Sequence, residues 1–250
     1  MIKPLHKDDL YKQCNQKISQ LMFFDVVEST NDVAKHLHKV MDKTLIIARH
    51  QTKGRGTQQR VFYSAKDKGI YASYIRKIDN LSFNVSFLPM VMACAVVKLC
   101  LTYNITPSIK WVNDITIKNK KCAGILCETF LDNHYVVIGV GINVVKQLFS
   151  EDIMDIATSL KEHGKDIHDL NIMVGQLINY FNELCLLSTQ QIITMYKTYC
   201  LNIEKNHLIK INNTSILAKA KDIDEKGRLV LTDQNSTYQL VSTTQIFNIY

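Results

Sequence analysis

Four apolar runs of strand length follow one another within residues 109–144, and they constrain the fold more than any other part of the sequence. The runs are IKWV, ITIK, CAGILCETFL and HYVVIGVGINV. The pairs Asn113–Asp114, Asn119–Lys120 and Asp132–Asn133 separate them, and residues of these types favour tight hairpins between antiparallel strands. The chain is therefore predicted to build a largely antiparallel sheet.

Further strands and helices are predicted on both sides of this region. Apolar runs indicate strands at residues 21–27, which we expect to be buried, and at 44–50 and 69–77. Apolar residues at helical spacing indicate helices from the Ser-Thr-Asn cluster to Met41, over about 86–103 and over 167–184. Ser188 and Gln191 form the capping box of another helix. Strands and helices do not alternate regularly, which favours an α+β domain.

From about Asn206 the sequence changes to short β-rich segments, with Gly227 in the tightest turn. This pattern predicts a small β-barrel that packs on the main domain. We therefore expect a main domain over residues 1–204 and a barrel over 205–250.

The bulk composition is that of an ordinary globular protein, with 46% hydrophobic and 21% charged residues. A net charge of +7 suits an anionic substrate but is too scattered to indicate a nucleic-acid binder. Seven cysteines without a CxxC pair predict core thiols in a reducing compartment rather than disulfides or a zinc site. The charged N-terminus does not resemble a signal peptide, and no uncharged apolar run reaches the length of a membrane span. The expected location is cytoplasmic.

Residues 51–60, QTKGRGTQQR, directly follow a predicted strand. Gly54 and Gly56 allow close approach and positive φ around an anion, and Arg55 and Arg60 can neutralise phosphate oxygens. The pattern matches neither GxxxxGKS nor GxGxxG. On spacing alone, a solvated basic loop is as good an interpretation as an anion cradle.

Three further stretches place polar residues or glycine at strand ends: KWVND (110–114), KKCAGIL (120–126) and GVGIN (139–143). Trp111 can stack on a planar group while Asp114 holds magnesium, or the segment is a core tryptophan followed by a turn. Lys121 can hold a carboxylate beside a phosphate, or it is an ordinary strand-end charge. The glycines of GVGIN leave room for a flat ligand or relieve crowding in the sheet.

The combination of motifs is far more specific than any one of them. ESTN, QxxGRGxxxR, KWxND, KxxGIL followed by Glu128, and GxGIN occur in this order between about Leu21 and Leu187. In this order and spacing the chain resembles the biotin protein ligases. The resemblance implies an α+β fold with a mixed, largely antiparallel sheet flanked by helices, as in class II synthetases, and a C-terminal SH3-like β-barrel. It also implies ATP, Mg²⁺ and biotin as ligands, and a biotin carboxyl carrier domain of a carboxylase as partner.

The resemblance implies the role of each site residue. Biotin binding falls to Ser29, Thr30, Asn31, Gln51, Gly54, Arg55, Gly56, Thr57, Lys121 and Gly124. Nucleotide binding falls to Arg55, Arg60, Lys110, Trp111, Asn113 and Asn143. The catalytic residues are Arg55, Lys121 and Asp114, the last also a possible Mg²⁺ ligand. The glycine–arginine loop is expected to close over a biotinyl-adenylate.

The chain departs from the usual loop, which is closer to GRGRxGRxW, at three positions. Thr57 replaces an arginine, Gln59 a glycine and Phe62 a tryptophan. Thr57 removes a cation from the lid, so the adenylate is expected to be held less tightly. Val112 stands where proline is usual, a change expected to matter little.

Two other functions compete with this interpretation. A lipoate or octanoate ligase shares the fold and the adenylating chemistry, but GRGxxxR and KWxND favour biotin. A basic nucleic-acid-binding protein is disfavoured because the basic residues are scattered. Residues 1–20 are too short for the winged-helix domain that some biotin ligases carry, so we expect a monofunctional enzyme, a monomer or homodimer, that binds neither nucleic acid nor a membrane.

Overall fold

Strands β3 (Gly69–Lys77) and β7 (Tyr135–Asn143) form the centre of the main sheet, because nearly all of their residues are buried and most are apolar. They pair antiparallel along their whole length, from Gly69 opposite Asn143 to Lys77 opposite Tyr135. The computed structural model describes residues 2–14, 17–57, 60–132, 134–211, 214–241 and 246–247.

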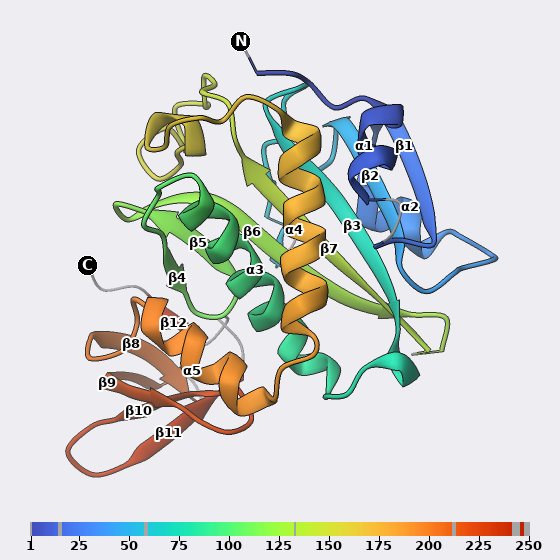
Figure 1. Cartoon of the computed structure of the whole chain (residues 1–250). Helices are drawn as coiled ribbons and strands as arrows, with labels where there is room; N and C mark the ends of the chain where they lie inside the picture. The colour runs from blue at the N-terminus through green and yellow to red at the C-terminus, as the bar shows by residue number, and fades with distance from the viewer. Residues whose placement is uncertain are drawn as a thin grey trace.

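The main sheet has seven strands in the order β1-β2-β3-β7-β6-β5-β4 (Figure 1). The other strands are β1 (Gln20–Val27), β2 (Thr44–Gln51), β4 (Ser108–Lys110), β5 (Asp114–Ile117) and β6 (Lys120–Phe130). Only β1 and β2 run parallel; every other neighbouring pair in this sheet is antiparallel. The predicted α+β fold with a mixed, largely antiparallel sheet is confirmed.

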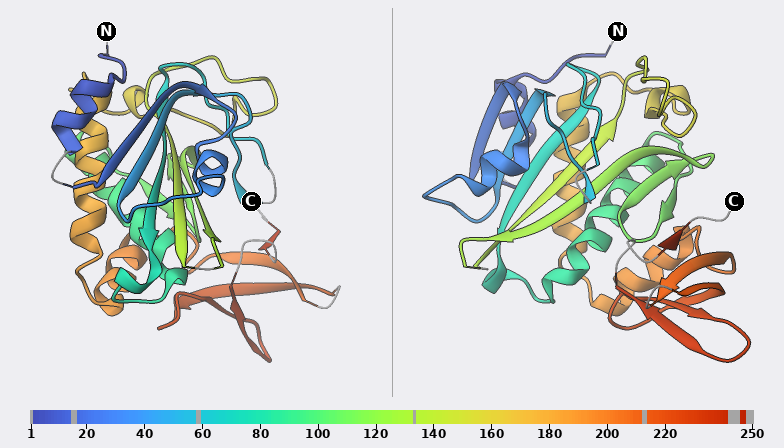
Figure 2. Two further views of the ribbon diagram at one scale, coloured as in Figure 1. Left: turned by 90° about the vertical axis from the view of Figure 1, so that its right-hand side faces the viewer. Right: turned by 180° about the vertical axis from the view of Figure 1, so that it is seen from behind.

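Helices cover both faces of this sheet (Figure 2). On one face lie α3 (Leu88–Thr102), α4 (Leu170–Leu184) and α1 (Lys7–Cys14), with α1 packed on α4. The short helix α2 (Thr30–Lys35) packs on β2, β3 and β7 from the other face. The 3-10 turns are η2 (Ile78–Asn80), η3 (Val85–Phe87) and η4 (Leu160–Glu162).

A second sheet follows helix α5 (Thr189–Tyr199), which begins at the predicted capping box of Ser188 and Gln191. Its strands are β8 (Asn206–Ile211), β9 (Thr214–Ile223), β10 (Leu229–Thr232), β11 (Thr237–Leu240) and β12 (Ile246–Phe247). The order is β11-β10-β9-β8-β12. Within the described residues these strands form an open antiparallel sheet, which is consistent with the predicted small C-terminal β unit although the barrel does not close. The division at residues 204 and 205 stays a prediction.

Two elements differ from the sequence-based expectation. Strand β1 lies at the edge of the sheet and is only partly buried, whereas its apolar run suggested a buried strand. Helix α2 ends at Lys35, although apolar residues continue at helical spacing to Met41. Leu37 and Val40 nevertheless pack with Ala34 in a small second core, so the spacing indicated burial correctly and helix length wrongly.

The apolar helix α3 and the turn before it meet the length and hydropathy of a membrane span over Val85–Thr102. That segment is 67% buried within the protein, as is usual for the central helix of a protein core. All seven cysteines are free, as predicted, and five are buried: Cys14, Cys94, Cys100, Cys122 and Cys200.

Candidate active site

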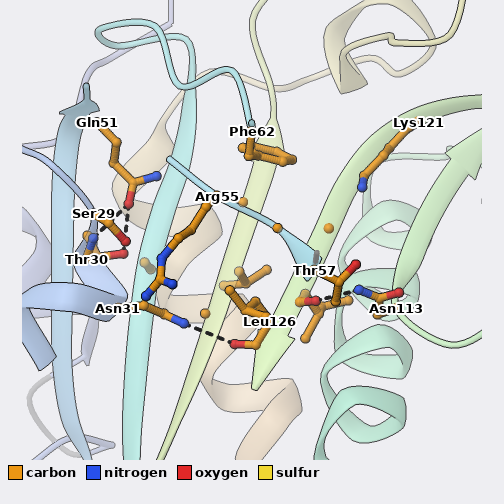
Figure 3. A pocket seen from close by; sticks show the side chains of 17 residues that line it. Ser29, Thr30, Asn31, Gln51, Arg55, Thr57, Phe62, Asn113, Lys121 and Leu126 are labelled. Carbon is orange, nitrogen blue, oxygen red and sulfur yellow. Dashed lines mark hydrogen bonds between the residues drawn. The ribbon is translucent and has the colours of Figure 1, made fainter. Parts of the chain in front are cut away.

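A pocket opens where the start of α2, the loop after β2 and the middle of β6 and β7 meet (Figure 3). The predicted site residues that line it are Ser29, Thr30, Asn31, Gln51, Arg55, Gly56, Thr57, Asn113, Lys121 and Gly124. These residues come from four of the five motifs. The fifth motif, GVGIN, also reaches the pocket, through Gly139 and Gly141.

Asn31 is held in one orientation at the floor of the pocket. Its amide nitrogen donates to the carbonyl oxygen of Leu126 at 3.3 Å and to Glu128 Oε2 at 2.9 Å. Its Oδ1 lies 2.6 Å from the hydroxyl of Ser73, which is fully buried. A Cβ atom at Gly139 would come within 2.3 Å of Asn31 Oδ1. The glycine at position 139 is therefore required for Asn31 to lie against β7.

Gln51 connects the start of α2 to the loop. Its side-chain oxygen accepts a hydrogen bond from the backbone N–H of Thr30 at 2.8 Å. Its amide nitrogen donates to Ser64 Oγ at 3.0 Å, and the Ser64 hydroxyl donates to the Phe62 carbonyl at 3.0 Å. The last residue of β2 thus fixes both walls of the pocket at this end.

Arg55 reaches from the loop into a group of charged residues beside α2. Its Nη2 contacts Asp32 Oδ1 closely and lies 3.5 Å from Glu128 Oε2. Lys35 joins the same carboxylates, at 2.9 Å from Glu128 and 3.6 Å from Asp32. Within the described residues, Arg55 Nε is buried without a hydrogen-bond partner. The Arg55 charge is thus compensated by protein carboxylates, while one of its donors is left unused.

Glu128 is ionised in this environment. Burial favours the neutral acid, but hydrogen bonds from Asn31 and Lys35 and the nearby Arg55 charge together lower the pKa of Glu128 below its ordinary value of 4.5. Its carboxylate can therefore hold Asn31 and Arg55 at neutral pH.

The loop folds back on itself as a narrow hairpin. Phe62 N–H donates to Gly54 O and Gly56 N–H to Arg60 O, both at 2.8 Å. Gly54 does not line the pocket, and a Cβ there would lie 2.6 Å from the Phe62 carbonyl oxygen. Of the nine glycines, all of which the structure describes, only Gly227 has positive φ. Gly54 therefore serves close approach and not positive φ, whereas a Cβ at Gly56 would make only an ordinary contact with Arg60 O at 3.8 Å. Gln59 lies outside the described residues.

Phe62 places its ring inside the pocket. A Cβ at Gly141 would come within 2.4 Å of the ring, so only glycine lets the ring lie against β7. The ring also lies 6.0 Å from Lys121 Nζ (Figure 3). An aromatic residue therefore occupies the wall between the floor of the pocket and its charged end.

Lys121 marks the charged end of the pocket. Its Nζ lies 2.6 Å from Asp114 Oδ1. Its backbone pairs with residues 156–158, since its N–H donates to Ile156 O and its carbonyl accepts from Thr158 N–H. Burial lowers the pKa of Lys110, and the positive charges of Lys121 and Arg60 lower it further. The negative charge of Asp114 opposes this shift. Lys110 thus lies among the charges of Asp114, Lys121 and Arg60.

Trp111 lies in the core and not in the pocket, which corrects the expected stacking role. Its side chain is 1% exposed and its Nε1–H donates to the Gly227 carbonyl at 3.2 Å. Since protein covers both faces of the ring, no nucleotide can stack on it in this structure. Asn113, two residues on, does line the pocket, and its amide donates to Ile125 O at 2.8 Å.

The other predicted residues outside the pocket wall are Gly54, Arg60, Lys110, Asp114 and Asn143. Asp114 is next to the wall through Lys121. Asn143 is 4% exposed and accepts a hydrogen bond from Gln147 at 3.1 Å. A role for Asn143 in adenine binding therefore requires the Gln147 side chain to move.

Sequence reasoning missed two sets of residues. The first is the apolar lining: Phe62, Ala72, Ile125, Leu126 and Val140. The second is the polar support behind it from Asp32 and Ser73, and also the role of Glu128, which the motifs included without assigning it a contact. Ser73 did carry a detectable pattern, because it is the only small hydroxyl residue within an otherwise apolar stretch of β3.

Asp114 fits a magnesium ion that arrives with a nucleotide. Mg²⁺ is usually held by one or two carboxylates together with phosphate oxygens, so a single well-placed Asp is enough. Within the described residues no group of three or more His, Cys, Asp or Glu side chains forms a complete metal site. The donor set therefore suits a metal bound through phosphates rather than one held by protein alone.

Comparison with known proteins defines the class to which this fold and pocket belong. Residues 23–143 match the biotin/lipoate A/B protein ligase family. The bifunctional ligase/repressor BirA of Bacillus spizizenii is 32% identical over 234 residues, covering 89% of this chain and 72% of the relative. The chain therefore belongs to the biotin/lipoate A/B protein ligase family.

Within that family the chain is similar to the biotin ligases. It is 28% identical to the biotin–[acetyl-CoA-carboxylase] ligase of Mycobacterium tuberculosis, with 76% of this chain and 74% of the relative covered. The biotin protein ligase of Aquifex aeolicus, solved in complex with biotin and ATP, has a TM-score of 0.80 and 25% identity. That likeness covers 90% of this chain and 97% of the solved chain.

Proposed function

We propose that this chain is an ATP-dependent biotin protein ligase. It activates biotin as biotinyl-5'-AMP and transfers the biotinyl group to the ε-amine of one lysine on a biotin carboxyl carrier domain. All biotin-binding residues implied by the sequence motifs, apart from Gly54, line one pocket, and this convergence carries the proposal. Free thiols at all seven cysteines support a cytoplasmic location.

The two ends of the pocket suit the two ends of biotin. The end near α2 offers fixed hydrogen-bonding groups from Ser29, Thr30 and Asn31, all at most 4% exposed, which suits the ureido ring. The apolar lining between suits the thiophane ring and the aliphatic tail. Lys121 at the other end suits the carboxylate, which must meet the α-phosphate of ATP.

The first half-reaction joins two anionic groups, so it needs positive charge at the point where they meet. One oxygen of the biotin carboxylate attacks the α-phosphorus, and pyrophosphate leaves. Lys121 can contact the carboxylate and the α-phosphate together, and Arg55 can reach the phosphate only when it exchanges Asp32 for the ligand. Magnesium held by the nucleotide and Asp114 would neutralise further phosphate charge.

In the second half-reaction a lysine amine of the carrier attacks the carbonyl carbon of the mixed anhydride, and AMP leaves. The attacking amine must first lose a proton. Asp114 is the nearest carboxylate to Lys121 and is partly exposed, so it can orient this amine and accept the proton. Phe62 and the loop hairpin exclude water from the anhydride, which would otherwise be hydrolysed.

Biotin-dependent pyrophosphate exchange into ATP tests the adenylation step directly. We expect exchange with biotin and none with lipoate, followed by transfer of labelled biotin to a purified carrier domain. Exchange with lipoate alone would assign the chain to the lipoate ligases of the family. Exchange with neither compound would contradict the proposal and favour a binding role.

A further inference from the structure

The pocket wall that carries Asn113, with Asp114 beside it, is held from behind by the C-terminal β unit. Residues 109–112 lie between this wall and the turn at 224–228, which joins β9 to β10. The backbone N–H of Trp111 donates to Asn202 Oδ1 at 2.7 Å, and its indole N–H donates to Gly227 O. Both acceptors lie more than ninety residues away along the chain.

The turn that supplies the Gly227 carbonyl is rigid. Asp224 Oδ1 accepts hydrogen bonds from the backbone N–H groups of Lys226 and Arg228, each at 2.9 Å. Asp224 Oδ2 accepts from Arg228 Nε at 2.7 Å. Gly227 has a φ of +78°, a conformation that side chains disfavour, so the turn needs glycine here.

The same turn is wedged against the first turn of α3. A Cβ at Gly227 would lie 3.0 Å from Met90 Sδ and 3.6 Å from Phe87 Cε1. Met90 is 1% exposed, so there is little space for the turn to shift. The position of the Gly227 carbonyl is therefore set by the core of the main domain as well as by the turn.

Two more contacts fix the same segment. The Tyr196 hydroxyl on α5 donates to Val112 O at 3.0 Å, and Tyr196 is fully buried. The Asn202 carbonyl bonds with His207 Nε2 on β8 at 3.0 Å, so the residue that holds the Trp111 backbone is itself held by the C-terminal sheet. The hydrogen bonds of the Trp111 backbone N–H, the Trp111 indole N–H and the Val112 carbonyl thus lead to Asn202, the C-terminal unit and α5.

We propose that Gly227 and Trp111 are positioning residues through which the C-terminal β unit sets the nucleotide-facing half of the site. Trp111 does not touch the nucleotide; it fixes the backbone that presents Asn113 to the pocket and Asp114 to Lys121. The β unit is then part of the ATP site, although none of its described residues lines the pocket. This inference rests on the proposed ligase function, because it takes Asn113 and Asp114 to face ATP.

The test perturbs one contact from both sides. Trp111→Phe keeps a buried aromatic ring and removes the indole N–H, while Gly227→Ala strains the turn and leaves Trp111 intact. We expect each variant to raise the KM for ATP about tenfold, the scale of one buried hydrogen bond, and to change the KM for biotin less than about twofold. The double variant should be little worse than either single one, because both remove the same contact.

Asp222→Asn is the matched control. It breaks the ion pair between Lys197 on α5 and Asp222 on β9, at 2.6 Å, which also joins the two parts of the molecule but does not touch residues 109–114. We expect both KM values of this variant to equal those of the unaltered protein. If Trp111→Phe and Gly227→Ala raised the KM for ATP and the KM for biotin equally, the contact would support the fold in general and not the ATP site. That result would overturn the proposal.

Trp111 supplies a readout that does not depend on turnover, because it is the only tryptophan. Its emission should shift to longer wavelength in Gly227→Ala and stay unchanged in Asp222→Asn, with the far-ultraviolet circular dichroism of both unchanged. Calorimetric titration with α,β-methylene-ATP then separates the two proposals. A protein that binds this analogue without biotin-dependent exchange contradicts the ligase function, whereas equal affinity in all variants contradicts the positioning role.

Discussion

At the scale of single residues, the main finding is that Arg55 is already paired within the protein. Asp32 and Glu128 neutralise the guanidinium that the motif predicts for phosphate binding. To bind an anionic ligand, Arg55 must therefore give up contacts with these carboxylates. The loss of those contacts lowers the net contribution of Arg55 to ligand affinity. The sequence placed Arg55 in the site, but it could not show this pairing because Glu128 lies 73 residues away.

Lys121→Ala tests the most direct residue assignment. Without the ammonium group, the carboxylate and the α-phosphate repel each other, so we expect biotin-dependent exchange to fall by about two to three orders of magnitude. Asp114 loses its partner but is partly exposed, so the fold should persist. Lys120→Ala, at the neighbouring and partly exposed lysine whose Nζ donates to the Met154 carbonyl at 3.4 Å, is the control and should exchange normally. Normal exchange by Lys121→Ala itself would refute the assignment.

Glu128 predicts a pH dependence of stability. Since its pKa is lower in the folded state than its ordinary 4.5, its contribution is complete above pH 4.5 and is lost as the pH falls through the folded pKa. We expect the free energy of unfolding in urea to drop below pH 4.5, and to drop less steeply in Glu128→Gln. Glu151→Gln, at an exposed position, should keep the original slope; an identical slope in Glu128→Gln would contradict the prediction.

At the scale of elements, the sequence predicted strand β3 residue for residue, because its apolar β-formers end at clear boundaries. It failed for α2, where Leu37 and Val40 are partly buried at helical spacing but lie beyond the helix end. Hydrophobic spacing reports which side of a segment faces the core, and a short non-helical stretch can satisfy it equally well. The sequence did predict the small C-terminal β unit, but strand lengths and turns do not determine whether its last strand closes on the first.

The loop after β2 supports a prediction about retention of the adenylate. Thr57 lines the pocket where an arginine is usual, so Thr57→Arg adds a cation near the phosphate. We expect dissociation of pre-formed biotinyl-adenylate to slow by roughly tenfold, the scale of one charged hydrogen bond. Rapid-filtration chase with unlabelled biotin and ATP measures it. Thr57→Val, which matches the native side chain in size, should release the adenylate no more slowly than the unaltered protein does.

At the scale of the whole molecule, the site is assembled from motifs spread over more than a hundred residues. Their order in the sequence predicted the fold, and nearly all of the residues expected to bind biotin line one pocket. It did not predict the role of Trp111, because a tryptophan at a strand end is equally compatible with a core position and an open one. Only the three-dimensional packing of residues 224–228 against residue 111 distinguishes the two.

The buried cysteine thiols allow the rate at which the folded structure opens to be measured. Burial raises the pKa of Cys14 and Cys200 to about 11, and that of Cys94 to about 12, so these groups are thiols at neutral pH as well as inaccessible. A thiol reagent can reach them only when the surrounding structure opens. We expect labelling that is slow, independent of reagent concentration at high reagent, and slower still with biotin and ATP. Labelling as fast as that of an unfolded chain would contradict this burial. Mass spectrometry gives the labelling rate of each cysteine. Cys14 and Cys94 then report the opening of the helical layer, and Cys200 reports the opening of the boundary with the C-terminal unit.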